Sequence, residues 1–137
     1  FQTQTAVQVG ASYSGLSLDD TTFDLFVVPA PGVTLEQAEA AMDEALITFL
    51  ETGVDADQLE RIKMQFRASE TYARDDAGGL AHRYGQALTQ GLTVADVQAW
   101  PALLQATSAE DIMQAARDVL DRTQSVTGWL MAPEVTQ

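Results

Sequence analysis

Apolar and polar residues alternate along two stretches near the start of the chain. The first, residues 5–13, carries apolar side chains at every second position, which is typical of a half-buried strand: Val7, Val9, Ala11 and Tyr13. The second, residues 22–28, begins with the same alternation and becomes apolar on both faces before Pro29 ends it. Residues 14–20 between them are too many for a tight turn. The pattern therefore predicts an antiparallel hairpin with a longer loop.

From residue 34 to residue 120, apolar residues recur three and four positions apart, as on one face of a helix. Polar caps and glycines divide this stretch into four or five helices. We expect them from Thr34 to Gly53, from Asp55 to about Arg74, from about Leu80 to Thr89, from Thr93 past Trp100, and from Thr107 to Leu120.

Three local signals qualify this division. Pro101 predicts a kink or a fresh first turn in the fourth helix. Thr107 with Glu110 makes a better capping box than Ser108 does. The pairs Asp75-Asp76 and Gly78-Gly79 weaken helix formation and predict the end of the second helix.

Charged residues are expected on the outer faces of these helices. On the first helix, the outer side carries four acidic residues: Glu36, Glu39, Asp43 and Glu44. Acid–base pairs four residues apart support the later helices: Asp57–Arg61, Glu70–Arg74 and Asp118–Arg122.

Residues 124–131 predict a closing strand, which Pro133 ends. The order strand, strand, four or five helices, strand separates strands from helices. Such segregation indicates the α+β class, with an antiparallel sheet packed against a layer of helices. The 137 residues suit one domain, and a chain of this length is expected to bury about two-thirds of its unfolded surface. Three strands are few for so many helical faces.

Charge narrows the classes of partner. The chain holds 20 Asp and Glu against 7 Lys and Arg, a net charge of −13, and no Lys or Arg precedes Arg61. Nucleic-acid binding needs clustered Lys and Arg, so we expect none. Binding to an anionic membrane is disfavoured for the same reason, and no apolar run reaches the roughly 18–20 residues of a membrane span. The acidic surface itself is explained by solubility.

No motif in the sequence indicates a catalytic, metal or cofactor site, and we predict none. The chain has no cysteine, which excludes thiolate ligands and cysteine nucleophiles. Its one histidine, His82, cannot supply a two-histidine zinc motif, and we interpret it as a partly exposed helical residue. Asp55 and Asp57 lack the glycine and glutamate that complete a calcium loop.

Three further features have structural interpretations. Asp19-Asp20 favours a turn, although a cation site at this loop stays open. Gly78-Gly79 has no lysine after it, so it is not a phosphate-binding loop. Trp100 and Trp129 are expected in a core or an interface.

The order and spacing of several segments resemble one known family. Residues 11–33 are similar to a hairpin of the pitrilysin/insulinase zinc peptidases, and Thr-Gly-Val-Asp-Ala-Asp-Gln-Leu-Glu-Arg-Ile-Lys, residues 52–63, is similar to that family's helix entry. Tyr-Gly-Gln-Ala-Leu at 84–88, with Gly-Leu-Thr at 91–93, resembles its next helix and turn. Residues 106–112, then Ser-Val-Thr-Gly-Trp-Leu at 125–130 and Pro133, resemble its closing helix and strand.

The resemblance implies a place within a larger protein. It identifies residues 1–137 as a partial or truncated domain, the later part of the carboxy-terminal domain, which lacks zinc. The family's H-x-x-E-H zinc ligands match nothing in the chain. Catalytic members contribute an Arg and a Tyr from this domain; here Val7 occupies the Tyr position and the Arg would fall at or before Phe1. Bacterial relatives are often exported, which favours the periplasm.

Two functions follow from the resemblance. In the first, the chain is a non-catalytic portion of a zinc metalloendopeptidase that forms a wall of the peptide-binding chamber, while an amino-terminal domain or a catalytic subunit holds the zinc. In the alternative, the parent protein is an inactive structural or interaction subunit. A third, unrelated interpretation is an acidic interaction module. The chain alone is expected to bind no zinc, to be inactive, and to pair with itself through uncovered sheet edges.

Overall fold

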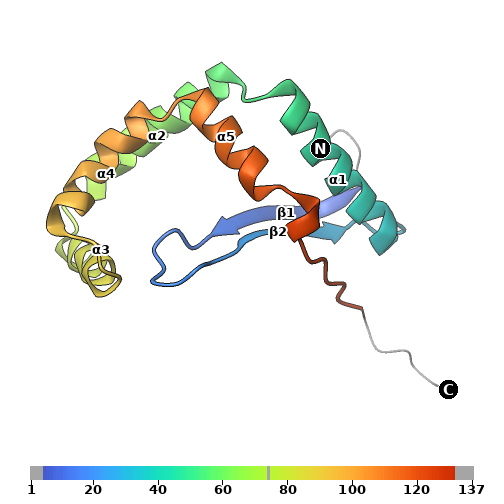
Figure 1. The fold of residues 1–137 in the computed structure, drawn as a ribbon, viewed down its shortest axis with the longest axis horizontal. Helices are drawn as coiled ribbons and strands as arrows, with labels where there is room; N and C mark the ends of the chain where they lie inside the picture. The colour runs from blue at the N-terminus through green and yellow to red at the C-terminus, as the bar shows by residue number, and fades with distance from the viewer. Residues whose placement is uncertain (1–4, 74, 132–137) are drawn as a thin grey trace.

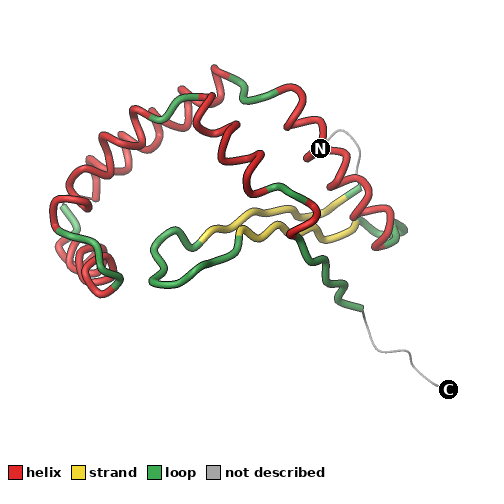
Figure 2. Tube along the Cα trace, in the orientation of Figure 1, coloured by secondary structure: helices red, strands yellow, loops and turns green. Residues whose placement is uncertain are grey.

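A computed structural model describes residues 5–73 and 75–131. A two-stranded antiparallel sheet comes first, and five helices and a short 3-10 turn follow (Figure 1, Figure 2). The elements are β1 (Ala6–Tyr13), β2 (Phe23–Pro29), α1 (Leu35–Thr52), α2 (Ala56–Ala73), α3 (Ala77–Thr89), α4 (Val94–Ala106), α5 (Ala109–Val119) and the turn Arg122–Gln124. The chain is therefore an α+β protein, as the sequence predicts.

The hairpin pairs its strands in a register that gives the sheet two different faces. Val9 lies opposite Val27 and Ala11 opposite Leu25, with a bulge between Ala6 and Gln8. Leu25 and Val27 are half-buried on the face that α1 covers. Phe26, on the opposite face, is exposed. The alternation expected for a half-buried strand is therefore present in β2. For β1 that prediction is wrong, because its alternate apolar side chains are exposed where no element covers them: Val7, Val9, Ala11 and Tyr13.

The helices begin where side chains satisfy free backbone N–H groups. Thr34 and Gln37 form the predicted capping box of α1, and the N–H of Gly53, at a φ of 80°, donates to the carbonyl of Phe49. Asp55 accepts a hydrogen bond from the N–H of Gln58 at the start of α2. These caps confirm the predicted starts of the first two helices.

Three predicted boundaries need correction. Asp76 accepts from the N–H of Gly79 at 3.0 Å, so α3 begins at Ala77 and includes both glycines. Ser108, with Asp111, forms the capping box of α5, while Thr107 ends α4. Pro101 lies inside α4 without dividing it into two helices.

The predicted closing strand is wrong. Residues 125–131 make no strand, and the sheet of the described residues has two strands rather than three. Side chains, not a backbone ladder, hold this segment to the rest of the chain, as the next section describes. Pro133 and Arg74 lie outside the described residues, and with them the predicted end of the strand and the Glu70–Arg74 pair.

The helices form an arch on one side of the sheet (Figure 1). Helix α4 packs against α2 and α3, and α5 packs against α1. A hydrogen bond from Gln105 Nε2 to the carbonyl of Lys63, 3.2 Å long, joins α4 to α2. Of the helices, α1 packs against β2 and so anchors the hairpin to the arch.

Little of the chain is buried. Among the described residues, the buried hydrophobic side chains are Ala38, Ala87, Val97 and Met113. The chain exposes 11029 Å², whereas a compact monomer of 14.8 kDa exposes about 7,000 Å² and its unfolded chain roughly 21,000 Å². Folding thus buries about half of the unfolded surface, not the expected two-thirds. The arch leaves apolar faces that no other element of the described chain covers.

Candidate functional site

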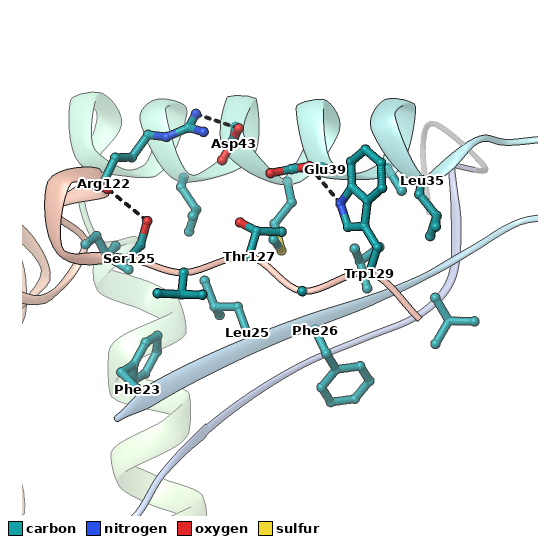
Figure 3. A pocket seen from close by; sticks show the side chains of 18 of the residues that line it. Phe23, Leu25, Phe26, Leu35, Glu39, Asp43, Arg122, Ser125, Thr127 and Trp129 are labelled. Atoms are coloured by element: carbon teal, nitrogen blue, oxygen red, sulfur yellow. Dashed lines mark hydrogen bonds and ion pairs between the residues drawn. The ribbon is translucent and has the colours of Figure 1, made fainter. Parts of the chain in front are cut away.

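A slot lies between α1 and β2, which Figure 3 shows from close by. Its volume is about 510 Å³. Four segments line it: β2 on one side, α1 on the other, residues 119–122, and residues 125–130, which run between α1 and β2 (Figure 3). We call this feature the α1–β2 slot.

Helix α1 gives the slot an apolar wall with two carboxylates in it. Leu35, Met42 and Leu46 line the slot and recur at the spacing of one helical face. Glu39 and Asp43 lie one turn apart on the same face and are half-buried. Both were expected on the outer side of the helix. That holds for Glu36 and Glu44, which are exposed, but is wrong for Glu39 and Asp43.

Each of these carboxylates accepts a hydrogen bond from the C-terminal part of the chain (Figure 3). Trp129 Nε1 donates to Glu39 at 2.9 Å, and Arg122 Nη1 donates to Asp43 at 2.6 Å. Arg122 was expected to pair with Asp118 on its own helix; it reaches Asp43 of α1 instead. The Arg122 side chain is 67% exposed, so this ion pair contributes at most about 1 kcal/mol.

Residues 125–131 are otherwise loosely held. No backbone hydrogen bond of the described residues joins them to β2. Val126 is 98% exposed and Leu130 is 95% exposed, although both are apolar. The segment therefore lies in the α1–β2 slot without filling it, and the hydrogen bond from Trp129 to Glu39 joins it to α1.

A second groove opens on the other side of α1, along β1. Its volume is about 770 Å³, and we call it the α1–β1 groove. Its strand wall includes Val7 and Val9, which are 62% and 70% exposed. Its helix wall is rich in alanine (Ala38, Ala41 and Ala45), which allows another element to approach α1 closely. No charged residue occurs before Asp19, so this edge of the sheet lacks the charges that usually protect an exposed strand.

Most of the residues that the sequence singled out lie apart from both features. His82 is exposed on α3, and Asp19 and Asp20 are exposed in the hairpin loop. Asp55 and Asp76 cap helices. Trp100 is 52% exposed on α4, whereas Trp129 contributes to the α1–β2 slot. Within residues 5–73 and 75–131, no three His, Asp or Glu side chains gather closely enough to hold a metal ion.

Several pKa shifts arise at the caps of helices and turns. Hydrogen bonds from Thr93 lower the pKa of Asp96, and those from Ser108 lower the pKa of Asp111. Near the slot, the N–H and hydroxyl of Thr123 likewise lower the pKa of Asp121. These carboxylates stabilise turns and helix starts.

Sequence reasoning missed Glu39 and Asp43 as slot residues. Their four-residue spacing was a signal, but the helix has acidic residues on several faces. Only the position of α1 over β2 distinguishes them.

None of the helices in the described part of the chain combines the length and hydropathy needed to cross a membrane. No protein-family model and no curated protein matches the chain.

Proposed function

We propose that the chain is a non-catalytic, carboxy-terminal portion of a zinc metalloendopeptidase of the pitrilysin/insulinase type. In this proposal residues 1–137 form one wall of a peptide-binding chamber. The zinc is held by an amino-terminal domain or by a separate catalytic subunit. Zinc there would polarise the scissile carbonyl and activate water.

The observation that carries the proposal is the uncovered side of the sheet. The edge of β1 has no strand paired to it in the described chain, and Val9 beside it is 70% exposed. The chain also exposes 11029 Å², about 4,000 Å² more than a compact monomer of its mass. Stable permanent interfaces bury about 2,000–5,000 Å² in total. A surface of this extent is what a part of a larger assembly needs.

The element order gives further support. A hairpin followed by consecutive helices agrees with the segments whose sequences resemble the family, except for residues 125–130, which form no strand. The sheet, with two strands, is too small to cover the helices, which agrees with a domain whose remaining strands come from elsewhere. On this proposal the missing strands continue the sheet from the edge of β1.

An inactive parent protein is the second candidate, and one implication of the family resemblance favours it. The resemblance places Val7 at the position where catalytic members of the family carry a substrate-holding tyrosine. A valine side chain cannot donate a hydrogen bond to a peptide or to a reacting oxygen. A parent with this substitution would bind or assemble without cleaving.

The test is a comparison of the isolated chain with the natural protein that contains it. The natural protein should be purified with any accompanying subunit, and its zinc content and hydrolysis of a quenched fluorescent peptide should be measured. The proposal predicts stoichiometric zinc and chelator-sensitive hydrolysis there, and neither in residues 1–137 alone. Zinc-free, inactive natural protein would favour the second candidate. Stoichiometric zinc on the isolated chain would refute both.

A further inference from the structure

The α1–β2 slot combines the features of a site for an extended peptide. One edge of β2 pairs with β1, and the described residues form no ladder along its other edge. Such an edge offers backbone donors and acceptors to an extended chain. Leu25 points from β2 toward the slot, whereas Phe26 points away from it (Figure 3). The apolar side chains of α1 complete a surface suited to alternate side chains of a strand.

The polar groups of the slot select for a donor-bearing ligand. Four charged residues line it, three acidic and one basic: Glu39, Asp43, Asp121 and Arg122. Without Arg122, which reaches in from the end of the chain, the lining would be acidic only. Glu39 and Asp43 accept hydrogen bonds, so they favour cationic or N–H-bearing side chains.

The chain itself supplies an occupant with this chemistry. Residues 125–130 enter the slot, and Trp129 and Arg122 offer an indole N–H and a guanidinium to its two carboxylates. The fit is incomplete, since Val126 and Leu130 remain almost fully exposed and no ladder to β2 forms. A ligand that also used the edge of β2 would make more contacts than this segment does.

We propose that the α1–β2 slot binds an extended peptide that bears a cationic and an aromatic N–H side chain, and that residues 122–131 occupy the slot as an internal competitor. Glu39 and Asp43 accept hydrogen bonds from the two donor side chains of the peptide, and β2 pairs with the peptide backbone. Removing the contacts of Arg122 and Trp129 frees the slot. The inference deepens the proposed function by naming where this wall binds peptide.

The test uses the full chain and a labelled peptide with the sequence of residues 122–131. Binding is followed by fluorescence anisotropy. The variant Arg122→Ala/Trp129→Ala weakens the internal competitor, so the peptide should bind it about tenfold more tightly than it binds the unaltered chain. Adding Glu39→Gln and Asp43→Asn should reduce that affinity about tenfold. A matched pair with the same charge change, Glu44→Gln and Glu51→Gln at exposed positions of α1, should leave it unchanged.

Absence of binding to the released variant, or equal loss with both pairs of substitutions, would overturn the proposal. If the released variant fails to fold, the Trp100→Phe chain grown with 5-fluorotryptophan carries a single fluorine label, at position 129, in an otherwise unaltered fold. Saturating unlabelled peptide, whose own tryptophan has no fluorine, should then shift the 19F resonance of Trp129 as the indole leaves the slot, and an unchanged spectrum would contradict the inference. The measurement needs no zinc. The slot can therefore fail to bind peptide while the peptidase proposal stands, and it can bind peptide even if the peptidase proposal fails.

Discussion

Phe26 lies across Gly10, its cross-strand partner in the hairpin, and fills the space that a side chain at position 10 would need. A Cβ added at Gly10 would overlap Cε1 and Cζ of the ring. An aromatic ring over a strand glycine shields backbone that the glycine cannot cover itself. Gly10 and Phe26 therefore form one structural unit on the outer face of the sheet.

This contact predicts a coupling between the two positions. Gly10→Ala forces the ring aside, whereas in the Phe26→Ala background the same change meets no ring and gains strand propensity. A double-mutant cycle in urea should show that Gly10→Ala lowers the free energy of unfolding by about 1 kcal/mol more with Phe26 present. Additive effects of the two substitutions would show that the ring does not lie over Gly10.

Arg83 and Glu70 join α3 to α2 through two parallel hydrogen bonds, 3.0 Å and 2.8 Å long. This bonding also raises the pKa of Arg83. Lysine cannot reproduce the planar pair of donors. Arg83→Lys should therefore lower the free energy of unfolding by about 1 kcal/mol, discounted for partial exposure. Arg67→Lys at an exposed position of α2 is the control; an equal effect there would contradict a specific role for Arg83.

The cap of α5 distinguishes Ser108 from Thr107. Ser108 Oγ accepts from the N–H of Asp111 at 3.1 Å, and Asp111 in turn accepts from the N–H of Ser108. Ser108→Ala should cost about 1 kcal/mol of unfolding free energy, as for other N-cap serines. Thr107→Ala removes only a side-chain bond to the carbonyl of Leu103 and should cost less. If thermal or urea denaturation shows a larger loss of stability for Thr107→Ala than for Ser108→Ala, Thr107 is the cap of α5.

Acid should destabilise the chain through its capping carboxylates. Hydrogen bonds to the charged forms lower the folded-state pKa of Asp96, Asp111 and Asp121 below the usual 3.8. The stability they contribute is complete above the unfolded pKa and is lost as pH falls through the lower folded pKa. The free energy of unfolding should therefore decline below about pH 4, and less steeply in Asp96→Asn/Asp111→Asn. An unaltered slope in that variant would exclude the caps as its cause.

Local signals predicted local structure well. The hairpin, the helix starts at Thr34 and Thr93, and the stop at Gly53 depend on residues close together in sequence, so pattern and cap chemistry suffice. Errors at Thr107 and Ser108 arose because two adjacent residues could serve the same role. The start of α3 was missed because glycine is a poor helix former, yet the Asp76 carboxylate satisfies the N–H of Gly79.

Long-range structure was predicted poorly. Residues 125–131 have a strand pattern, but a strand needs a partner, and Trp129 instead donates to Glu39, ninety positions earlier. Arg122 likewise pairs with Asp43 rather than with Asp118, its expected partner. Such choices depend on how α1 and β2 are placed, which periodicity along the chain does not specify. The α1–β2 slot could not be predicted from the sequence for the same reason.

The most direct test of the account is hydrogen exchange at the backbone amides of β1. The central claim is that another part of a larger assembly covers the edge of β1 and the α1–β1 groove. In the isolated chain, backbone amides on the outer edge of β1 should exchange quickly with solvent. In the natural assembly, the same amides should exchange at least about 100-fold more slowly. Amides of β2 that donate to β1 in the hairpin serve as internal references. Equally fast exchange at the outer edge in both preparations would contradict the claim.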